Sequence, residues 1–424
     1  MTAGLELYWG AAKLLHYVLP WWLRLRAHKG LEDAGRLQEK MGEISHTRPD
    51  GTVIWCHAAS VGECRAALPL VQKMLQLNDH VSVIITTVTR TGAEMVAQNA
   101  MPRLVHQYAP LDTPQAVARF LAHWQPAAMM VIENELWPNT LRLLAHKNIP
   151  AMLINARLSD TSLRRWRRIE KSFSQILNIF QIILPQTPAL AETLRTITTT
   201  AVAYVGNIKA AGSQLRHDAQ DVEKIKRSIG ARPVVLLAST HEGEDDLAVE
   251  ISQATKKHHP LIIIAPRHPA RAGQIVQKLH HFFPTILQRS HGHTPGADTL
   301  LYLADSMGEM GRWFALADIT VLGGSFVPRG GHNPLEPAWA HTAIITGPDM
   351  RNQVVFHAEM LALGAILQIE RGEVAATVDR LLGNAQERET LQRNAHAYAA
   401  QQGDVLEKVF QQLRPHLERV NIRA

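Results

Sequence analysis

Two patterns of hydrophobic residues alternate along this chain from residue 52 onward. Short runs of consecutive apolar residues are followed by longer segments in which apolar residues recur every three or four positions. The first pattern predicts strands buried on both faces, and the second predicts the helices that cover them. In the first half we expect strands at 52–57, 81–88, 127–132, 151–155, 181–184 and 201–205, with helices at 63–77, 91–99, 114–124, 137–147 and 188–196.

The same rhythm restarts after a break at GNIKAAG (206–212). A length of 424 residues also suits two domains. The two series together predict an α/β protein with two tandem doubly wound, Rossmann-like domains, and an active site in the cleft between them, since ligands bind beyond the carboxyl ends of such strands. The second-half strands are expected at 234–238, 261–265, 285–288, 299–303, 319–322, 343–346 and 365–368, before a helical tail.

The first thirty residues have a different character. Aromatic side chains that favour the membrane headgroup zone are followed at once by a basic cluster, which favours an anionic cytoplasmic leaflet. Glu6, Lys13 and Pro20 interrupt the apolar stretch, whereas a spanning helix needs ~20 nearly continuous apolar residues. We expect an interfacial membrane-anchor helix; a single span or an amphipathic helix packed on the protein's own core remain alternatives. The residues concerned are Tyr8, Trp9, Tyr17, Trp21, Trp22, Arg24, Arg26, His28 and Lys29.

Composition narrows the class of protein. With 46% hydrophobic and 19% charged residues, the chain is not of a disordered, collagenous or coiled-coil type. A net charge of +6 suits an anionic ligand or membrane surface and is too small to indicate nucleic acid. The only cysteines, Cys56 and Cys64, and the 22 histidines show no metal-ligand spacing, so we expect no metal site and a reducing compartment.

Two acidic motifs follow predicted strands of the first half. In HAASVGE (57–63), Gly62 permits a tight turn, Ser60 is placed to cap a helix, and Glu63 lands in the first helical turn. The helix dipole should keep Glu63 ionised at neutral pH, which suits a general base; the alternative is a purely capping role. In ENELWPN (133–139), Glu133 and Glu135 would face one side of an extended segment, or are simply acids before a helix.

The second half holds a glycine-rich motif, GGSFVPRGGHNPLEPA (323–338), between a predicted strand and a helix near 333–336. Its backbone lets a ligand approach closely, and a helix N-terminus presents N–H groups to an anion. His332 and Asn333 lie at that end, and Glu336 is placed to accept hydrogen bonds from sugar hydroxyls.

Three further features are weaker evidence for a binding site when each is taken alone. APRHP (265–269) places Arg267 and His268 at a strand's carboxyl end, as phosphate ligands or as a solvated turn. SMGEMG (306–311) is a helix entry, and Lys209 is a lone cation near the break. The basic run after NARLS (155–159), which includes Arg164 and Arg165, is either a docking patch for phosphates or anionic lipid, or a solvated helix face.

Together, in this order, these motifs resemble the 3-deoxy-D-manno-octulosonic acid (Kdo) transferases of lipopolysaccharide synthesis over essentially the whole chain. HAASVGE and HNPLEPA are the most specific part. The resemblance implies a GT-B fold and transfer of Kdo from CMP-Kdo to the 6′-hydroxyl of a lipid A precursor (lipid IVA), at the cytoplasmic face of the inner membrane. It implies no cofactor, no metal and no nucleic-acid partner. The chain departs from the family at GNIKAAG, where G-[NS]-L-K-F-D is common, but it keeps Lys209.

The resemblance also implies residue roles. Glu63 would be the general base of an inverting transfer, and Glu133 and Glu135 would be active-site acids acting on the acceptor or on Kdo. CMP-Kdo would be bound by Lys209, Arg267, His268, Gly308, Glu309, Met310, Ser325, His332, Asn333 and Glu336. The acceptor would be bound by Ser60, Gly62, Arg157, Arg164 and Arg165.

The expected organisation has five parts: an anchor (1–30), an acceptor-binding domain (31–208), a linker (209–230), a CMP-Kdo-binding domain (231–402) and a helix that packs back toward the first domain (403–424). Three other functions stay open. They are a GT-B glycosyltransferase that uses a UDP-sugar, a non-catalytic lipid-binding relative, and a sugar-phosphate epimerase of the same architecture.

Overall fold

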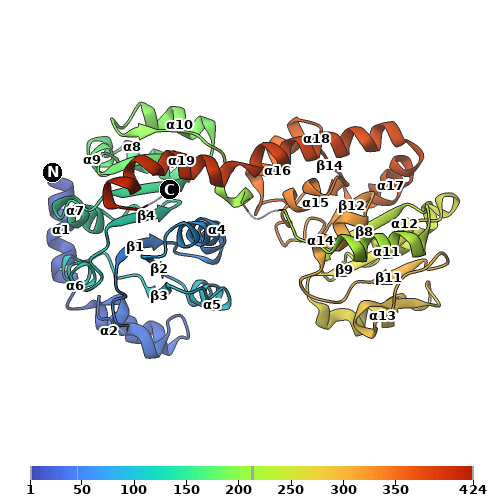
Figure 1. The fold of residues 1–424 in the computed structure, drawn as a ribbon, viewed down its shortest axis with the longest axis horizontal. Helices are drawn as coiled ribbons and strands as arrows, with labels where there is room; N and C mark the ends of the chain where they lie inside the picture. The colour runs from blue at the N-terminus through green and yellow to red at the C-terminus, as the bar shows by residue number, and fades with distance from the viewer. Residues whose placement is uncertain (1, 45, 212–213, 423–424) are drawn as a thin grey trace. The chain divides into compact units, whose positions relative to one another are not determined.

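The computed structural model describes residues 2–44, 46–211 and 214–422, so Gly212, at the end of the predicted break, lies outside the described residues. The chain forms two compact units (Figure 1). The first comprises Met1–Ala211 together with Asp404–Ala424, and the second comprises Gly212–Gly403.

The first unit is built on seven parallel strands in the order β3-β2-β1-β4-β5-β6-β7. The order reverses between β1 and β4, and in sheets of this type ligands bind beyond the carboxyl ends of the strands at such a switch point. The strands are β1 (Thr52–His57), β2 (Val81–Thr87), β3 (Leu104–Tyr108), β4 (Ala128–Ile132), β5 (Ala151–Ala156), β6 (Phe180–Pro185) and β7 (Ala201–Val202).

Helices cover both faces of this sheet. Core residues of α4 and α19 pack on one face, and those of α1, α6, α7, α9 and α10 pack on the other. Several helices begin at a Ser or Thr whose hydroxyl accepts a backbone N–H, as sequence capping signals predict. The helices are α1 (Ala3–Leu15), α2 (Leu19–His28), α3 (Leu37–Lys40), α4 (Val61–Leu77), α5 (Arg90–Gln98), α6 (Pro114–Trp124), α7 (Pro138–His146), α8 (Asp160–Arg167), α9 (Glu170–Leu177), α10 (Pro188–Arg195) and α19 (Val405–Leu417).

The second unit has its own parallel sheet, in the order β10-β11-β9-β8-β12-β13-β14. Its switch point lies between β8 and β12. The strands are β8 (Val234–Thr240), β9 (Leu261–Pro266), β10 (Ile286–Gln288), β11 (Leu301–Leu303), β12 (Ile319–Leu322), β13 (Ala343–Thr346) and β14 (Ile366–Gln368).

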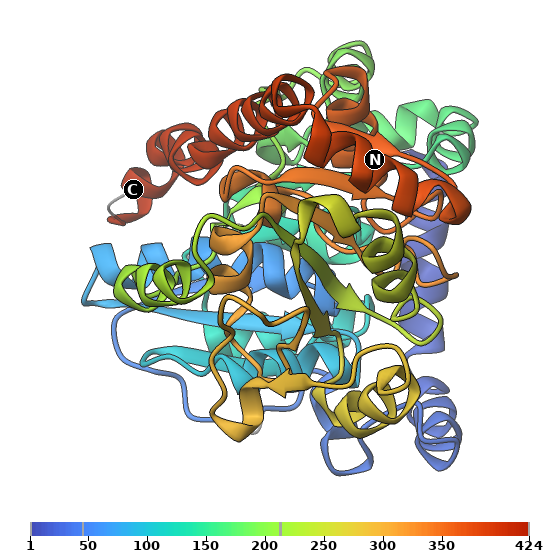
Figure 2. The ribbon, with the colours of Figure 1, turned by 90° about the vertical axis from the view of Figure 1, so that its right-hand side faces the viewer.

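Residues of α12, α13, α17 and α18 pack on one face of the second sheet, and those of α11 and α14 pack on the other (Figure 2). Residues 219–229, inside the segment expected to be a linker, form α11 and bury three apolar side chains in this core. The helices are α11 (Ala219–Ile229), α12 (Leu247–Ala254), α13 (Ala272–Leu279), α14 (Met310–Leu316), α15 (Leu335–Trp339), α16 (Val354–Ala362), α17 (Val374–Gly383) and α18 (Ala385–Gly403).

Every strand expected from the sequence is present, which confirms the two parallel-sheet α/β domains. One strand, β3, was not predicted. It lies at the edge of the first sheet and carries His106 and Gln107, whose polar side chains break the apolar run.

The N-terminal helices pack on the first unit through one face only. Leu5 and Ala12 of α1 are buried, and Tyr8 donates a hydrogen bond to Asp112 at 3.1 Å. The opposite face is apolar and open, with Leu7 76% and Tyr17 77% exposed. Ten of the twenty large hydrophobic side chains exposed among the described residues lie within residues 7–31. No helix in the described part of the chain combines the length and the apolar character needed to cross a bilayer.

Candidate functional site

The carboxyl end of β1 leads directly into α4, and this corner holds Glu63. Ser60 is the N-cap, and its hydroxyl donates to Glu63 Oε1 at 2.9 Å. The Ala59 N–H donates to Glu63 Oε2 at 2.7 Å. Glu63 therefore does satisfy groups at the start of α4, as the capping alternative proposed. The same two hydrogen bonds orient both of its carboxylate oxygens.

The ionisation expected for Glu63 was wrong. The side chain is only 7% exposed, and burial raises its pKa to about 7, with the charges of Glu135 and Glu133 adding to the rise. Hydrogen bonds from Ala59 and Ser60 oppose this rise without cancelling it. Desolvation outweighs the helix N-terminus, so the carboxyl titrates near neutral pH instead of remaining ionised.

Gly62 does not form the tight turn that the sequence suggested. It lies in the first turn of α4 with a negative φ, and a Cβ there would meet nothing within 4 Å. Its missing side chain leaves open space beside Ser60 and Glu63.

Glu133 and Glu135 follow β4, the neighbour of β1 across the switch point. The expectation that both face one side of an extended segment was wrong, because Glu133 adopts a left-handed backbone with φ 65°. It forms an ion pair with Lys209, whereas Glu135 Oε2 lies 3.9 Å from His57 Nε2. Burial would raise the pKa of Glu135, but its contacts with His57 and Trp137 outweigh burial and lower it.

His57 is a site residue that sequence reasoning missed. It is the last residue of β1 and is fully buried. Its Nδ1 lies 2.8 Å from Thr86 Oγ1, and its ring packs on Trp137 with centroids 4.3 Å apart. The signal was its position at a strand's carboxyl end, in the first letter of HAASVGE.

We define Glu63, Glu133 and Glu135 as the acid cluster, and Lys209 contacts it through its ion pair with Glu133. Lys209 lies in a short 3-10 helix, Ile208–Ala210, whose Ile208 N–H donates to Asn155 Oδ1 at 3.0 Å. Asn155 lies near the carboxyl end of β5, at the same edge of the sheet, and its backbone is left-handed (φ 58°), like that of Glu133. Lys209, a lone cation near the break in the sequence, is thus held at the carboxyl edge of the first sheet.

In the second unit, a buried carboxylate joins the two loops at the switch point. Glu244, in the loop after β8, accepts hydrogen bonds from Gly324 N at 2.8 Å and Phe326 N at 3.1 Å, and also from His241 N at 2.9 Å. Burial raises its pKa, while these three N–H groups favour the charged form. Gly323 is required here, because a Cβ would lie 2.5 Å from Ser239 O.

Cationic side chains gather around His241. Its Nε2 lies 3.0 Å from His332 Nε2, and its ring centroid is 6.0 Å from that of His268. Burial first, and then the charges of four neighbours, lower the pKa of His241. We call these four, Arg267, His268, Arg271 and Arg329, the cation cluster. Sequence reasoning named only the first two of these. His241 carried the same signal, a polar residue just past a buried strand, whereas Arg271 lies five residues beyond β9, at the end of a 3-10 helix.

The glycine-rich motif is more structural than its composition suggested. Ser325 is fully buried, and its hydroxyl donates to Leu322 O and accepts from Gly347 N at 2.8 Å, so it is not presented to a ligand here. The helix α15 has only five residues, and Asn333 Oδ1 caps it by accepting from Leu335 N at 3.1 Å. Asn333 and Glu336 lie together, with Nδ2 3.5 Å from Oε1.

The SMGEMG segment lies past β11 and places Glu309 among arginines. Glu309 pairs with Arg289 at 2.8 Å and with Arg312, and these contacts hold its pKa at about 2. Gly308 has φ 80°, and Met310 begins α14. Glu309 is therefore an ionised group that orients two guanidinium groups.

The expected acceptor arginines are all exposed. Arg157 directly follows β5 at the carboxyl edge, and Arg164 and Arg165 lie on α8. No group of three His, Cys, Asp or Glu side chains in the described ranges is arranged to hold a metal ion.

Comparisons with known proteins agree on one family. Residues 35–211 match the family described as 3-Deoxy-D-manno-octulosonic-acid transferase (kdotransferase). A probable mitochondrial 3-deoxy-D-manno-octulosonic acid transferase of Arabidopsis thaliana is 31% identical, over 97% of this chain and 95% of its own length. The 3-deoxy-D-manno-octulosonic acid transferase of Haemophilus influenzae is 32% identical, over 91% of this chain and 92% of its own length.

Among solved structures, a putative UDP-N-acetylglucosamine 2-epimerase from Listeria monocytogenes matches with a TM-score of 0.56, over 87% of this chain and 97% of that one. At 11% identity it shows a shared fold alone. The two relatives, similar along nearly their whole length, decide the family: this chain belongs to the 3-deoxy-D-manno-octulosonic acid transferases, which are glycosyltransferases.

Proposed function

We propose that this protein transfers Kdo from CMP-Kdo to the 6′-hydroxyl of a lipid A precursor (lipid IVA) in lipopolysaccharide biosynthesis, by an inverting mechanism with Glu63 as general base. Membership of the family supports the reaction class. The observation that carries the mechanism is the acid cluster at the β1/β4 switch point, in which Glu63 has a pKa of about 7. A base works best when its pKa lies near the working pH.

The two carboxylates nearest this corner take different roles because their environments push their pKa values apart. Glu63 accepts the proton of the attacking hydroxyl. The hydroxyl oxygen then bonds to the anomeric carbon of Kdo, while the bond from that carbon to the phosphate breaks and its electron pair leaves with CMP. Glu135, whose pKa is lowered, stays ionised and either holds the acceptor or balances positive charge on the reacting sugar. Lys209 neutralises Glu133.

The donor would be held by the second unit. A CMP-sugar carries one phosphate, and the cation cluster supplies the guanidinium groups that match it, so no divalent ion is needed for charge balance. Arg267 and His268 follow β9 and are exposed at its carboxyl end. Met310, His332, Asn333 and Glu336 would bind the nucleoside and sugar, and Glu309 would act through Arg289 and Arg312.

The acceptor is an anionic glycolipid, which gives a use to the open apolar face of α1 and α2. This face would lie in the headgroup zone at the cytoplasmic side of the inner membrane. The exposed Arg157, Arg164 and Arg165 would contact the acceptor phosphates, with Ser60 and Gly62 beside the reacting hydroxyl.

The test is transfer from CMP-Kdo, generated in situ, to a tetraacylated lipid A precursor, with products read by mass and metal ions chelated. We expect product masses raised by one or more Kdo units. Glu63→Gln should abolish transfer, whereas Glu192→Gln, which neutralises an exposed carboxylate on α10, should not. A Glu63→Gln enzyme with near-normal turnover would remove Glu63 from the base role. Absence of CMP-Kdo binding would favour a different donor, such as a UDP-sugar.

A further inference from the structure

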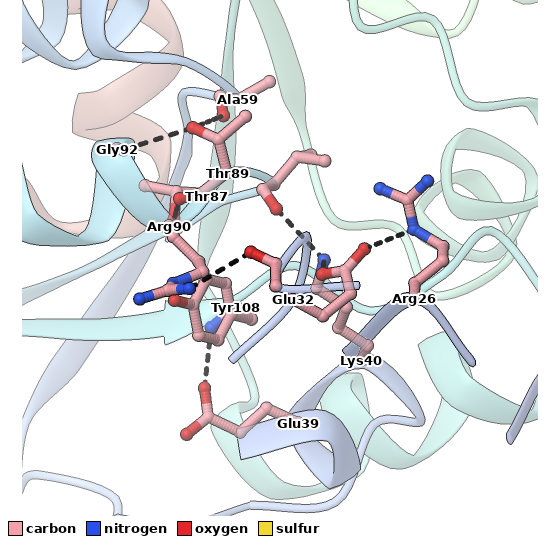
Figure 3. Close-up of polar contacts among 12 residues, drawn as sticks. Arg26, Glu32, Glu39, Lys40, Ala59, Thr87, Thr89, Arg90, Gly92 and Tyr108 are labelled. Atoms are coloured by element: carbon pink, nitrogen blue, oxygen red, sulfur yellow. Dashed lines mark hydrogen bonds and ion pairs between the residues drawn. The ribbon is translucent and has the colours of Figure 1, made fainter. Parts of the chain in front are cut away.

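A buried ion pair joins the segment after α2 to the loop after β2. Lys40 is 5% exposed and forms an ion pair with Glu32, which is 6% exposed. Arg26 donates to the other carboxylate oxygen of Glu32 at 2.7 Å, so Figure 3 shows Glu32 held from two sides. Burying such charges costs desolvation that their mutual attraction seldom exceeds. Apolar side chains would stabilise this segment equally well, so stability alone does not explain the ion pair. The explanation lies in the further contact that the Lys40 ammonium makes.

The Lys40 ammonium also donates to Val88 O at 3.0 Å. The Val88 side chain is exposed, so the backbone, not side-chain packing, fixes this loop. Val88 N and Thr89 N donate to Ala59 O at 3.0 and 3.2 Å, and Thr89 lies beside Ala59 in Figure 3. Ala59 N in turn donates to Glu63 Oε2 at 2.7 Å. An unbroken series of hydrogen bonds therefore runs from Lys40 to the carboxylate.

We propose that Lys40, held by Glu32, is a positioning residue for Glu63: it fixes the 88–89 loop, which fixes Ala59, whose N–H aims the carboxylate at the acceptor hydroxyl. This inference rests on the proposed function of Glu63 as base. The series transmits position and not protons, because the Ala59 carbonyl and the Ala59 N–H belong to different peptide groups, separated by an α-carbon that carries no exchangeable hydrogen.

Replacing Lys40 should change the pH dependence of the reaction rate as well as the stability of the protein. The Ala59 N–H favours the charged carboxylate, so a loosened Ala59 makes Glu63 harder to ionise. The acid limb of the rate profile then moves to higher pH. Among the described residues, the other titratable groups that face Glu63 make no hydrogen bond to Lys40, whose ammonium donates to Glu32 and Val88 O. They are Cys56, Cys64, Glu133, Glu135 and, paired with Glu133, Lys209.

The experiment measures kcat and both KM values of the full chain across about pH 5.5 to 9. We expect Lys40→Met to lower kcat about tenfold and to move the acid limb up by about one pH unit, with each KM changed less than about twofold. Lys40→Arg should restore most of the rate, because a guanidinium can also donate to Glu32 and Val88. The double variant Glu32→Gln/Lys40→Met removes the buried carboxylate together with its ammonium partner and decides the matter if Lys40→Met fails to fold.

Arg103→Met is the matched control. Arg103 donates to Leu75 O at 2.6 Å and Val81 O at 2.8 Å, at the amino end of β2, so its loss should lower thermal stability and leave the pH profile unchanged. If the Lys40 variants behave like this control, the positioning role is overturned. An active Glu63→Gln enzyme would instead overturn the proposed base, whereas an inactive one combined with an unshifted Lys40→Met profile overturns only the positioning role.

Discussion

Replacing Glu63 with glutamine should stabilise the first unit at neutral pH even as it removes the proposed base. Burial raises the pKa of this carboxyl from 4.5 to about 7. The folded state thus holds the proton more tightly than the unfolded chain does. The resulting stability is complete below about pH 4.5 and is lost as the pH rises through about 7. Glutamine stays neutral throughout, so it avoids this loss.

The size of the effect follows from the pKa shift. At about 1.4 kcal/mol per pKa unit, the wild type loses at most about 3.5 kcal/mol between about pH 4.5 and 8 relative to the variant. The glutamine carbonyl can still accept the Ala59 N–H, so the main capping contact persists in Glu63→Gln. The difference in free energy of unfolding should therefore grow with pH in favour of the variant.

Urea unfolding at a series of pH values, followed by tryptophan fluorescence, measures this difference. The signal reports mainly the first unit, because seven of the nine tryptophans belong to it: Trp9, Trp21, Trp22, Trp55, Trp124, Trp137 and Trp166. Glu192→Gln is the control, since its exposed carboxylate should give no pH-dependent difference. A Glu63→Gln difference that stays constant with pH would refute the elevated pKa, and with it the argument that Glu63 is matched to neutral pH.

Three other predictions follow from the structure. Arg267→Ala should weaken CMP-Kdo binding about tenfold or more while leaving the acceptor KM nearly unchanged; equal losses for both substrates would argue against a phosphate contact. Gly311→Ala should destabilise the second unit by about 1–3 kcal/mol in chemical denaturation, because the new Cβ would lie 2.5 Å from Arg216 O; unchanged stability would mean that this backbone moves freely. Trp21→Ser should reduce flotation with anionic vesicles several-fold, whereas Phe282→Ser, an exposed apolar change in the second unit, should not; equal effects would place membrane binding elsewhere.

The strand pattern was predictable because most strands are buried on both faces and read as apolar runs. The edge strand β3 was not predictable from the sequence, and its polar residues show why. Gln107 is fully buried, and its Oε1 accepts the Trp124 indole N–H at 2.9 Å. His106 Nε2 lies 2.9 Å from Thr87 Oγ1. Partners that make buried polar groups acceptable come from other elements, so the sequence window around β3 cannot reveal them.

The same limit applies to the site. The motifs could be assigned to one edge of each sheet because parallel strands end on the same side. The charge states of the site residues could not be predicted from the sequence, because they depend on tertiary burial and on partners distant in sequence. Glu63 lies at a helix N-terminus, as predicted, yet desolvation raises its pKa to about 7, so the carboxyl is only partly ionised at neutral pH. Lys209 is a lone cation at the start of the expected linker, and only the fold brings it to Glu133, 76 positions earlier in the chain.

If the proposed function holds, the division of charge between the two sheets has a chemical reason. A base with a pKa near 7 cannot have free cations beside it, because they would lower that pKa and weaken its proton affinity. The donor phosphate, in contrast, requires cations. The first unit meets one demand by gathering carboxylates and by engaging Lys209 with Glu133. In the proposed transfer, the second would meet the other with the cation cluster around His241. Placing the two groups on separate sheets would let each keep the electrostatics that its half of the transfer needs.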